Sequence, residues 1–396
     1  MLVGSSDFAE TLTCSATRRN KDMDYQYKRN RALNPLGGDI DTRESWIQNP
    51  AVPFCRRLVC ASLIATLLAA SQGAAQQSRT DFLQEPACQT LQPAATGGAM
   101  PKNPAVMVLR WLGAANHEIA YRGQVILLDA YYERTPPARP LGFTRADVNR
   151  ADAIFIGHGH SDHLADGPFV AQRTGAPLIG ARLTTAKAIE MGLPGKQTVT
   201  VAGGEIQQFK GFTVEAILAR HSVRSPEFTR AADGAWRAMA TATGLTRTPE
   251  DEQRERQIRV GVTDPRLADE GTIAYLFSFD DGLRLIYLDS SGPITEGEKK
   301  VMQRIGGRTD VAIVAYQGFY VAPRQIEATL PLVKLFHPRV FLPTHHDDTG
   351  GYFPDMAIYP LAMAIRDELP GSRSVSPLYR TPICFDTRTK EMYGGP

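Results

Sequence analysis

The sequence predicts an α/β fold in which helices cover mixed β-sheets, and three observations lead to this prediction. The chain has 396 residues, of which 43% are hydrophobic, so it can bury a large core. Apolar runs typical of short strands dominate from residue 106 to residue 130. Farther along, segments typical of strands and of helices alternate, as they do in layered α/β domains.

The elements can be justified in chain order from residue 105 onward, where one domain is predicted to extend to residue 396. Runs of β-branched and other apolar residues predict strands, with Arg122-Gly123 and Asp280-Asp281-Gly282 at hairpin turns. These runs are residues 106–113, 117–123, 124–130, 152–157, 177–181, 197–201, 212–219, 272–289, 311–316, 340–344 and 376–385. Helical spacing and terminal signals predict helices near Thr144 and at residues 184–192, 295–305 and 324–336. Residues 222–270 are polar and irregular, which indicates an insertion.

The composition excludes several classes of protein. Lysine and arginine number 44 and aspartate and glutamate 42, a net charge of +2, so no nucleic-acid partner held by bulk charge is indicated. A disordered tail, a collagen-like fibre and a disulfide-dense miniprotein do not fit this composition either. We expect a small-molecule substrate, and the sequence does not indicate an oligomeric state.

Residues 55–75 are typical of a secretory signal peptide. Arg56 and Arg57 precede the apolar run LVCASLIATLLAA at residues 58–70, and small residues follow it. The run is shorter than the about 20 residues of a membrane-spanning helix, so we expect a periplasmic or secreted protein with no stable membrane insertion after cleavage. Residues 1–54 are interpreted as an unstructured or wrongly annotated extension. A single N-terminal anchor helix is the alternative.

Two cysteines, Cys88 and Cys384, follow the predicted signal peptide. In an oxidising compartment they could form one disulfide between an extended N-terminal arm, residues 76–104, and the last predicted strand, but the sequence does not decide this. Two separate buried thiols are the alternative. Neither cysteine has a second one nearby, so no cysteine-based zinc site is expected.

A cluster of metal-binding residue types directly follows the apolar run that begins at residue 152. Its spacing is H-x-H-x-D-H, formed by His158, His160, Asp162 and His163. Imidazole nitrogens and carboxylate oxygens are ligands of zinc, and also of iron and manganese. Loops at the carboxyl ends of strands are where α/β proteins tend to place their sites.

Further candidate ligands close three other apolar runs. They are His221, Asp289 and the pair His345 and His346. A structural zinc site needs four ligands and is closed to substrate. The candidate ligands in this sequence are more than four. They favour an open, catalytic centre with two metals.

With these residues, and with Trp111-Leu112-Gly113 and His117–Ile119 near its start, the chain resembles the metallo-β-lactamase-fold hydrolase superfamily. Within it, the sequence is similar to the branch that contains ascorbate-6-phosphate lactonase and N-acyl phosphatidylethanolamine phospholipase D. The resemblance covers about residues 106–350. It implies a four-layer αβ/βα sandwich with the metals at one edge of the sheets.

The resemblance also implies a ligand set. His158, His160 and His221 would bind one metal, Asp162, His163 and a late histidine the other, and Asp289 would bridge the two. Two features depart from the family pattern. Leu288 precedes Asp289 where the family usually has glycine, and the late histidine is doubled. The position directly after Pro343-Thr344 matches the family better, which predicts His345 as the ligand.

The implied activity is hydrolysis of a lactone, a carboxylic ester or a phosphodiester by a hydroxide that bridges two divalent metals. Zinc is expected, with manganese and iron as alternatives. Asp162 or Asp289 would orient the nucleophile, and His346, if it is not a ligand, would donate a proton to the leaving group. The alternatives are a β-lactamase, which the lactonase-like opening motif disfavours, and a non-catalytic or redox metal-binding member of the fold.

Overall fold

The computed structural model describes residues 84–134, 138–222, 271–316, 322–347 and 354–394, together with isolated positions between residues 230 and 253. The predicted extension and signal peptide, the beginning of the predicted arm and most of the predicted insertion lie outside the described residues. Within those ranges, the helices are too short or too polar to cross a lipid bilayer.

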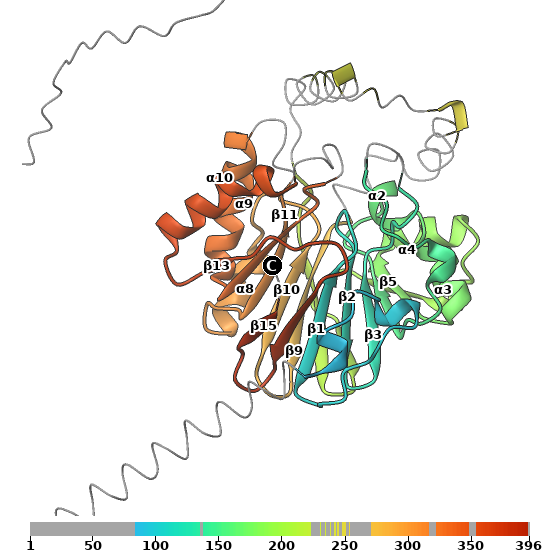
Figure 1. The fold of residues 1–396 in the computed structure, drawn as a ribbon, viewed down its shortest axis with the longest axis horizontal. Coiled ribbons are helices and arrows are strands. Elements are labelled where there is room, and N and C mark those ends of the chain that lie inside the picture. Colours follow the sequence, from blue (N-terminus) through green and yellow to red (C-terminus); the bar gives the residue numbers. More distant parts are fainter. Residues whose placement is uncertain are drawn as a thin grey trace, which may run out of the picture. The chain divides into compact units, whose positions relative to one another are not determined.

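Two mixed β-sheets form the centre of the domain (Figure 1). Within the described ranges, the first sheet has eight strands in the order β15-β14-β1-β2-β3-β4-β5-β6. Its strands are β1 (Val106–Trp111), β2 (His117–Tyr121), β3 (Gln124–Leu128), β4 (Ala153–Phe155), β5 (Leu178–Ala181), β6 (Thr198–Val201), β14 (Pro382–Asp386) and β15 (Met392–Gly394). The strands from β3 to β6 are parallel, and the others pair antiparallel.

All the described strands of the second sheet come from the C-terminal half of the chain. Among the described residues it has seven strands in the order β13-β12-β11-β10-β9-β8-β7. They are β7 (Ile206–Phe209), β8 (Phe212–Leu218), β9 (Ile273–Phe279), β10 (Arg284–Leu288), β11 (Val311–Ala315), β12 (Val340–Thr344) and β13 (Arg373–Ser374). The strands from β10 to β13 are parallel, and β7 to β10 are antiparallel.

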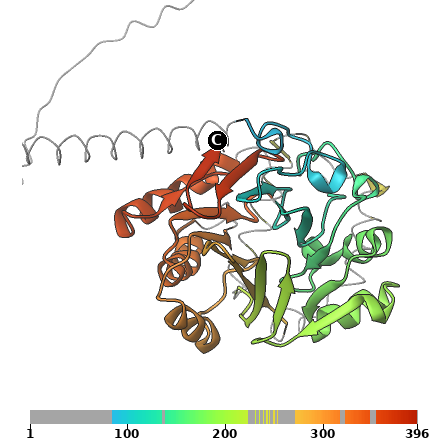
Figure 2. The same cartoon turned by 90° about the horizontal axis from the view of Figure 1, so that it is seen from below.

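Helices cover the outer faces of both sheets (Figures 1 and 2). Beside the first sheet lie α2 (Ser161–Leu164), α3 (Gly167–Thr174) and α4 (Arg182–Glu190), and beside the second lie α8 (Glu296–Arg304), α9 (Ala322–Phe336) and α10 (Pro354–Glu368). Single 3-10 turns occur at Pro86–Cys88, Ala94–Thr96, Arg145–Asp147 and Gly195–Gln197.

The core shows why the chain forms layers. In β1, Met107 and Leu109 point between the two sheets, whereas Val106 and Val108 point to the outer face under the N-terminal segment and helices. In β10, Leu285 and Tyr287 likewise face the first sheet, and Ile286 faces the outer helices. Because successive side chains of a strand point to opposite faces of the sheet, each of these strands contributes to two cores. The predicted four-layer αβ/βα sandwich is confirmed.

The helix predicted near Thr144 is wrong in extent, because only one 3-10 turn forms there. Thr144 and Asp147 make a capping box, but Val148 is already extended. The amides of Asn149 and Arg150 donate to the carbonyl oxygen of Ala95 at 2.9 and 3.2 Å instead of continuing a helix. Hydrogen bonds to a distant segment have replaced those of a second helical turn.

Other boundaries also differ from the prediction. The final long strand begins at Pro382 and not at residue 376, and Arg380 just before it has a left-handed backbone with φ of +64°. The patterns did not predict β7, β15, α3 or α10. Helix α10 contains Pro360, a residue that usually argues against a helix interior.

The described part of the N-terminal arm is fastened to the outer face of the first sheet by a buried ion pair. Arg110 Nη1 lies 3.0 Å from Glu118 Oε1, and both side chains are fully buried. Arg110 also donates to the carbonyl oxygen of Ala87, while the Glu118 carboxylate accepts the amides of Ala94 and Ala95 at 3.0 and 2.6 Å. Each charge is thus compensated by the arm that covers it.

Cys88 and Cys384, whose pairing the sequence left open, form a disulfide. The two Cα atoms are 6.1 Å apart, and 296 residues separate the cysteines in the sequence. The bond joins the arm to β14 next to β1. A cross-link that closes so long a loop restricts the unfolded chain strongly.

We expect the double variant Cys88→Ser, Cys384→Ser to lose about 2–5 kcal/mol of unfolding free energy, because its unfolded state is less restricted. Urea denaturation followed by circular dichroism would measure the loss. Wild-type protein treated with dithiothreitol is the matched control and should lose a similar amount. Equal stability of the variant and the oxidised wild type would contradict the prediction.

Candidate metal centre

The fold brings the carboxyl ends of several strands to one edge. β10 and β12 run in the same direction, and β8 and β10 share it because both are antiparallel to β9. His221, Asp289 and His345 follow these three strands, and His158 follows β4 of the other sheet. All four residues line one cavity. The convergence expected from the sequence is therefore present.

The loop after β4 fits against the second sheet only because it contains glycine. A Cβ atom on Gly157 would lie 2.1 Å from Cγ of Asp289, so any side chain would collide with that carboxylate. The carbonyl oxygen of Gly157 accepts the amide of Ile273 at 2.8 Å, which links the loop to β9. Gly157 thus allows the histidine loop and Asp289 to approach each other.

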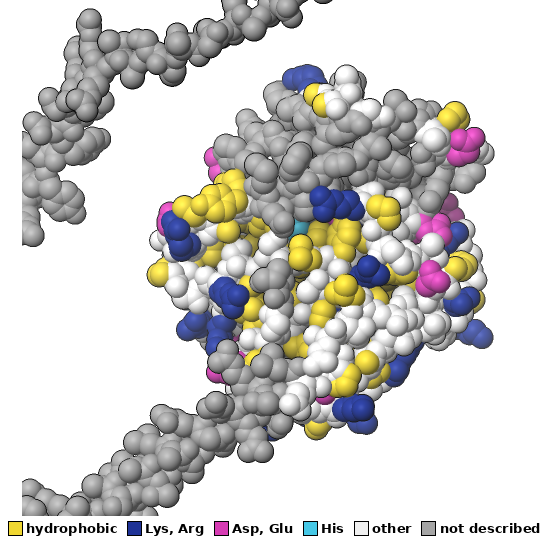
Figure 3. Space-filling view, viewed as in Figure 1, with side chains coloured by type: hydrophobic (Ala, Val, Ile, Leu, Met, Phe, Trp, Pro, Cys, Tyr) yellow, Lys and Arg dark blue, Asp and Glu magenta, His cyan; other side chains and the backbone are white. Residues whose placement is uncertain are grey.

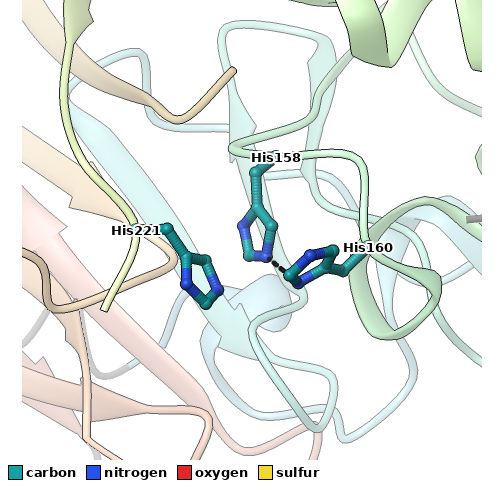
Figure 4. Close-up of side chains that lie close together, drawn as sticks. All are labelled: His158, His160 and His221. Atoms are coloured by element: carbon teal, nitrogen blue, oxygen red, sulfur yellow. Dashed lines mark hydrogen bonds between the residues drawn. The ribbon is translucent and has the colours of Figure 1, made fainter. Parts of the chain in front are cut away.

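Three histidines from two distant segments converge in the first donor group, formed by His158, His160 and His221 (Figure 4). Each offers a ring nitrogen, and these nitrogens all lie within 4.8 Å of one another. Nε2 of His158 is 3.0 Å from Nδ1 of His160. Gly292, where a Cβ would meet the carbonyl oxygen of Arg220 at 2.0 Å, keeps the segment of His221 against that of Asp289.

Asp162, His163 and His345 form a second donor group. Nε2 of His345 lies 3.1 Å from Nε2 of His163 and 3.1 Å from Oδ2 of Asp162. Two imidazole nitrogens that face each other can form a hydrogen bond only if one carries a proton. Lone pairs that converge in this way are typical of ligands to a shared cation.

Asp289 lies between the two groups. Its Oδ2 is 2.7 Å from Nδ1 of His158 and 3.2 Å from Nδ1 of His163. Its Oδ1 is buried and has no hydrogen-bond partner among the described residues. A buried carboxylate oxygen without a partner is costly, and a divalent cation would satisfy it. The donor set therefore fits divalent metal ions of the zinc, iron or manganese type.

The electrostatics of the cluster follow from burial and from the close carboxylates. Burial disfavours the charged form of His163, but Asp162, Asp129 and Asp289 outweigh it and raise the pKa of His163 to about 9. Burial, together with the neighbouring His163, places the pKa of His158 well below its ordinary value. Burial raises the pKa of Asp289. The protein alone thus attracts positive charge to the carboxylates of this site.

Asp129, which follows β3, was not among the predicted site residues. Its Oδ2 accepts a hydrogen bond from Tyr287 at 2.6 Å and lies 2.6 Å from Nδ1 of His163, and its Oδ1 accepts the amide of Gly157 at 2.9 Å. Burial and the nearby Asp289 raise the pKa of Asp129 to about 6. The sequence signal for Asp129 was weak: it is an acidic residue at the end of a predicted strand. That strand precedes the one from which the histidine loop emerges.

His345 is held at the cavity by the carbonyl oxygen of Ala114. This oxygen accepts hydrogen bonds from Trp111 Nε1 at 2.7 Å, Thr344 Oγ1 at 2.8 Å and the amide of His345 at 2.9 Å. His345 has a φ of +63° and Ala114 one of +48°, a backbone region that L-residues seldom adopt. The amide of Ala114 donates to Asp347 Oδ1 at 3.0 Å, and Asp347 pairs with Arg134. These contacts impose the strained turn that directs His345 into the site.

His346 points elsewhere. Its ring stacks on that of Trp111, with a centroid distance of 4.3 Å and an angle of 20° between the planes. It is buried and is not among the residues that line the cavity. Of the two neighbouring histidines, His345 is the one beside the other donors. The role of proton donor predicted for His346 receives no support from this placement.

The cavity lining beyond the donors is mainly polar. It consists of Ser222, Ser290, Ser291, Gln325 and Ala315. The amide of Ser222 donates to Oγ of Ser290 at 3.0 Å, which joins the segments of His221 and Asp289. On the face shown in Figure 3, only a small area of histidine surface is visible. His158, His163, Asp289 and His345 are buried. Asp162, with 32% of its side chain exposed, is more accessible than Asp289 or the neighbouring Asp129.

Comparison with known proteins agrees with this geometry. The model of the β-lactamase superfamily domain matches residues 124–346, a segment that contains all the donors of the cluster. A UPF0173 metal-dependent hydrolase of Cupriavidus necator is 25% identical over 240 residues, which cover 60% of this chain and 72% of that protein. A UPF0173 metal-dependent hydrolase of Methanopyrus kandleri is 30% identical over 116 residues, or 29% of this chain and 48% of that protein.

Among solved structures, Igni18, a metallo hydrolase from Ignicoccus hospitalis, aligns with a TM-score of 0.48 and 15% identity, covering 71% of this chain and 98% of that one. The family match spans more than half of the chain and includes both halves of the sandwich. The chain therefore belongs to the metallo-β-lactamase superfamily, the fold family expected from its histidine motif.

Proposed function

We propose that this protein is a hydrolase that uses two divalent cations, zinc first and manganese or iron as alternatives. His158, His160 and His221 would hold one cation, and Asp162, His163 and His345 the other. Asp289 would contact both. The observation that supports this proposal best is the buried Oδ1 of Asp289, which has no hydrogen-bond partner among the described residues and lies between two groups of donors.

When bound, such cations lower the pKa of water to about 7 and take up negative charge that develops on a substrate oxygen. The protein supplies the geometry. Asp162, the partly exposed carboxylate, would accept a hydrogen bond from the attacking water and orient it. Asp129 holds His163 in one tautomer and orientation, because a bond to one ring nitrogen leaves the other as the donor to the cation.

The proposed substrate is a small molecule with a lactone, carboxylic ester or phosphodiester group. Water would add across the acyl C–O bond to give an acid and an alcohol, or across a P–O bond to give a phosphomonoester and an alcohol. A small cavity with a mainly polar lining supports a compact, oxygen-rich substrate group. The named relatives are metal-dependent hydrolases, which agrees with this class of reaction.

We also propose a periplasmic or secreted location. The disulfide between Cys88 and Cys384 supports it, because such bonds persist mainly in oxidising compartments. The basic pair and apolar run at residues 55–75 support it as well. Sequencing the N-terminus of the protein recovered from its cell of origin would test the signal peptide, with a new terminus near residue 75 as the expected result.

Metal content gives the first prediction. We expect about two equivalents of divalent metal per chain by mass spectrometry. Asp289→Ala should hold less than one equivalent, because both donor groups lose a shared ligand. His337→Ala, which removes a histidine outside the cluster, is the matched control and should leave the content unchanged. One equivalent in the wild type would contradict the two-metal proposal.

Activity gives the second prediction. Zinc-loaded protein should hydrolyse at least one member of a panel formed by γ-butyrolactone, 4-nitrophenyl acetate and bis(4-nitrophenyl) phosphate. Chelation should abolish the rate, and added zinc or manganese should restore it. Nitrocefin belongs in the same assay, since preferential hydrolysis of this β-lactam would favour a β-lactamase. A rate that survives complete metal removal would contradict a metal-dependent mechanism.

Asp129 gives the third prediction. Asp129→Asn should weaken metal affinity or turnover by about 10- to 100-fold, because the amide no longer fixes the tautomer of His163. Competition with a chromophoric chelator would measure the affinity. Asp152→Asn, where the carboxylate also accepts a backbone amide but lies before β4 and not at the cavity, is the control. Equal affinities and rates for Asp129→Asn and the wild type would contradict the assigned role.

A further inference from the structure

Gln325 is a buried polar residue at the cavity to which no role has yet been assigned. It lies in the first turn of α9 and is only 8% exposed, yet it lines the cavity together with the metal-binding side chains. Its carboxamide makes no hydrogen bond to any residue that the structure describes. Neither polar atom of the carboxamide is among the fully buried side-chain atoms that lack a partner, so the group reaches the open space of the cavity that Gln325 lines.

The backbone that carries Gln325 is fixed at the same edge of the sheet. Thr329, one helical turn later and on the same face of α9, donates from Oγ1 to the carbonyl oxygen of Ala315 at 3.0 Å. Thr329 is fully buried, and Ala315 itself lines the cavity at the end of β11. The helix therefore holds the carboxamide in a defined place, as a substrate contact requires.

Most of the other polar side chains that line the cavity are hydrogen-bond acceptors or already make hydrogen bonds within the protein. Asp162 and Asp289 only accept hydrogen bonds when ionised, and Ser290 accepts the amide of Ser222. The Gln325 carboxamide is a neutral donor of two hydrogen bonds. A neutral donor suits an oxygen on which negative charge develops during the reaction, because the hydrogen bond to that oxygen becomes stronger as its charge increases.

We propose that Gln325 contacts the substrate, donating a hydrogen bond from Nε2 to an oxygen of the group at the metal centre. This inference rests on the proposed function. The group would be the carbonyl oxygen of an ester or lactone or a phosphoryl oxygen, which share the same acceptor chemistry. Gln325 acts as a hydrogen-bond donor to the reacting group and does not bind metal.

The experiment uses the full-length, metal-loaded protein and three variants. Gln325→Met keeps the length of the side chain and removes its donors. Gln325→Glu replaces the donors with a carboxylate and serves as a second, polar variant if the first folds poorly. Gln303→Met, on the exposed side of α8, is the matched control. Thermal unfolding and metal analysis would accompany each measurement.

The probe is inorganic phosphate, a tetrahedral oxyanion, titrated by calorimetry. We expect Gln325→Met to raise its Kd by about 10-fold or more, and Gln325→Glu to raise it further through repulsion. On 4-nitrophenyl acetate and bis(4-nitrophenyl) phosphate, kcat should fall by about 100-fold with metal content unchanged. The substrate on which the variants lose more of kcat/KM identifies the acyl or phosphoryl class. Gln303→Met should match the wild type throughout.

Two results would overturn this inference. One is wild-type affinity and kinetics in both Gln325 variants at full metal content. The other is a metal-loaded wild type that does not bind phosphate. A wild type that holds no metal would overturn the proposed function itself, and metal analysis distinguishes that failure from the other two.

Discussion

Charge buried at one edge of the sandwich is the constraint on which the rest of this structure depends. Asp129 and Asp289 have no exposed side-chain surface, and both lie among imidazole rings. An isolated carboxylate in such a place would be prohibitively unstable. The surrounding elements compensate it: Tyr287 and the amide of Gly157 bond Asp129, and His158 and His163 contact Asp289. The fold can keep these groups buried only while a bound proton or a nearby positive charge neutralises them.

The two sheets contribute unequal parts of the site. The first sheet supplies one continuous loop with four donors, which a local motif encodes. The second supplies single residues at the ends of separate strands, which only the topology brings together. Contacts between the sheets at this edge keep the halves aligned, for example between Gly157 and Ile273 and between Ala114 and His345. Precision of the site therefore rests on backbone contacts between sheets as much as on the donors.

This division explains what could be predicted from sequence. The histidine loop, the strand-end positions of His221, Asp289 and His345, and most central strands follow from local pattern, since periodicity and residue chemistry are local properties. Asp129 could not be singled out, because a single acidic residue after a strand is common and its partners, Tyr287 and His163, lie far away in the sequence. Gln325 was missed for the same reason. The prediction of a helix near Thr144 was wrong because the next amides, those of Asn149 and Arg150, donate to a carbonyl oxygen of the N-terminal arm instead of to the preceding turn.

The order of strands has a consequence for how the chain is made. β14 and β15, near the end of the sequence, complete the sheet that begins with β1, and Cys384 must be present before Cys88 can pair. During synthesis one edge of β1 therefore has no partner strand until β14 has been made, near the end of the chain. Pairings between such distant segments form slowly. A nascent chain of this kind can complete its first sheet, and the cross-link across it, only when synthesis is nearly over.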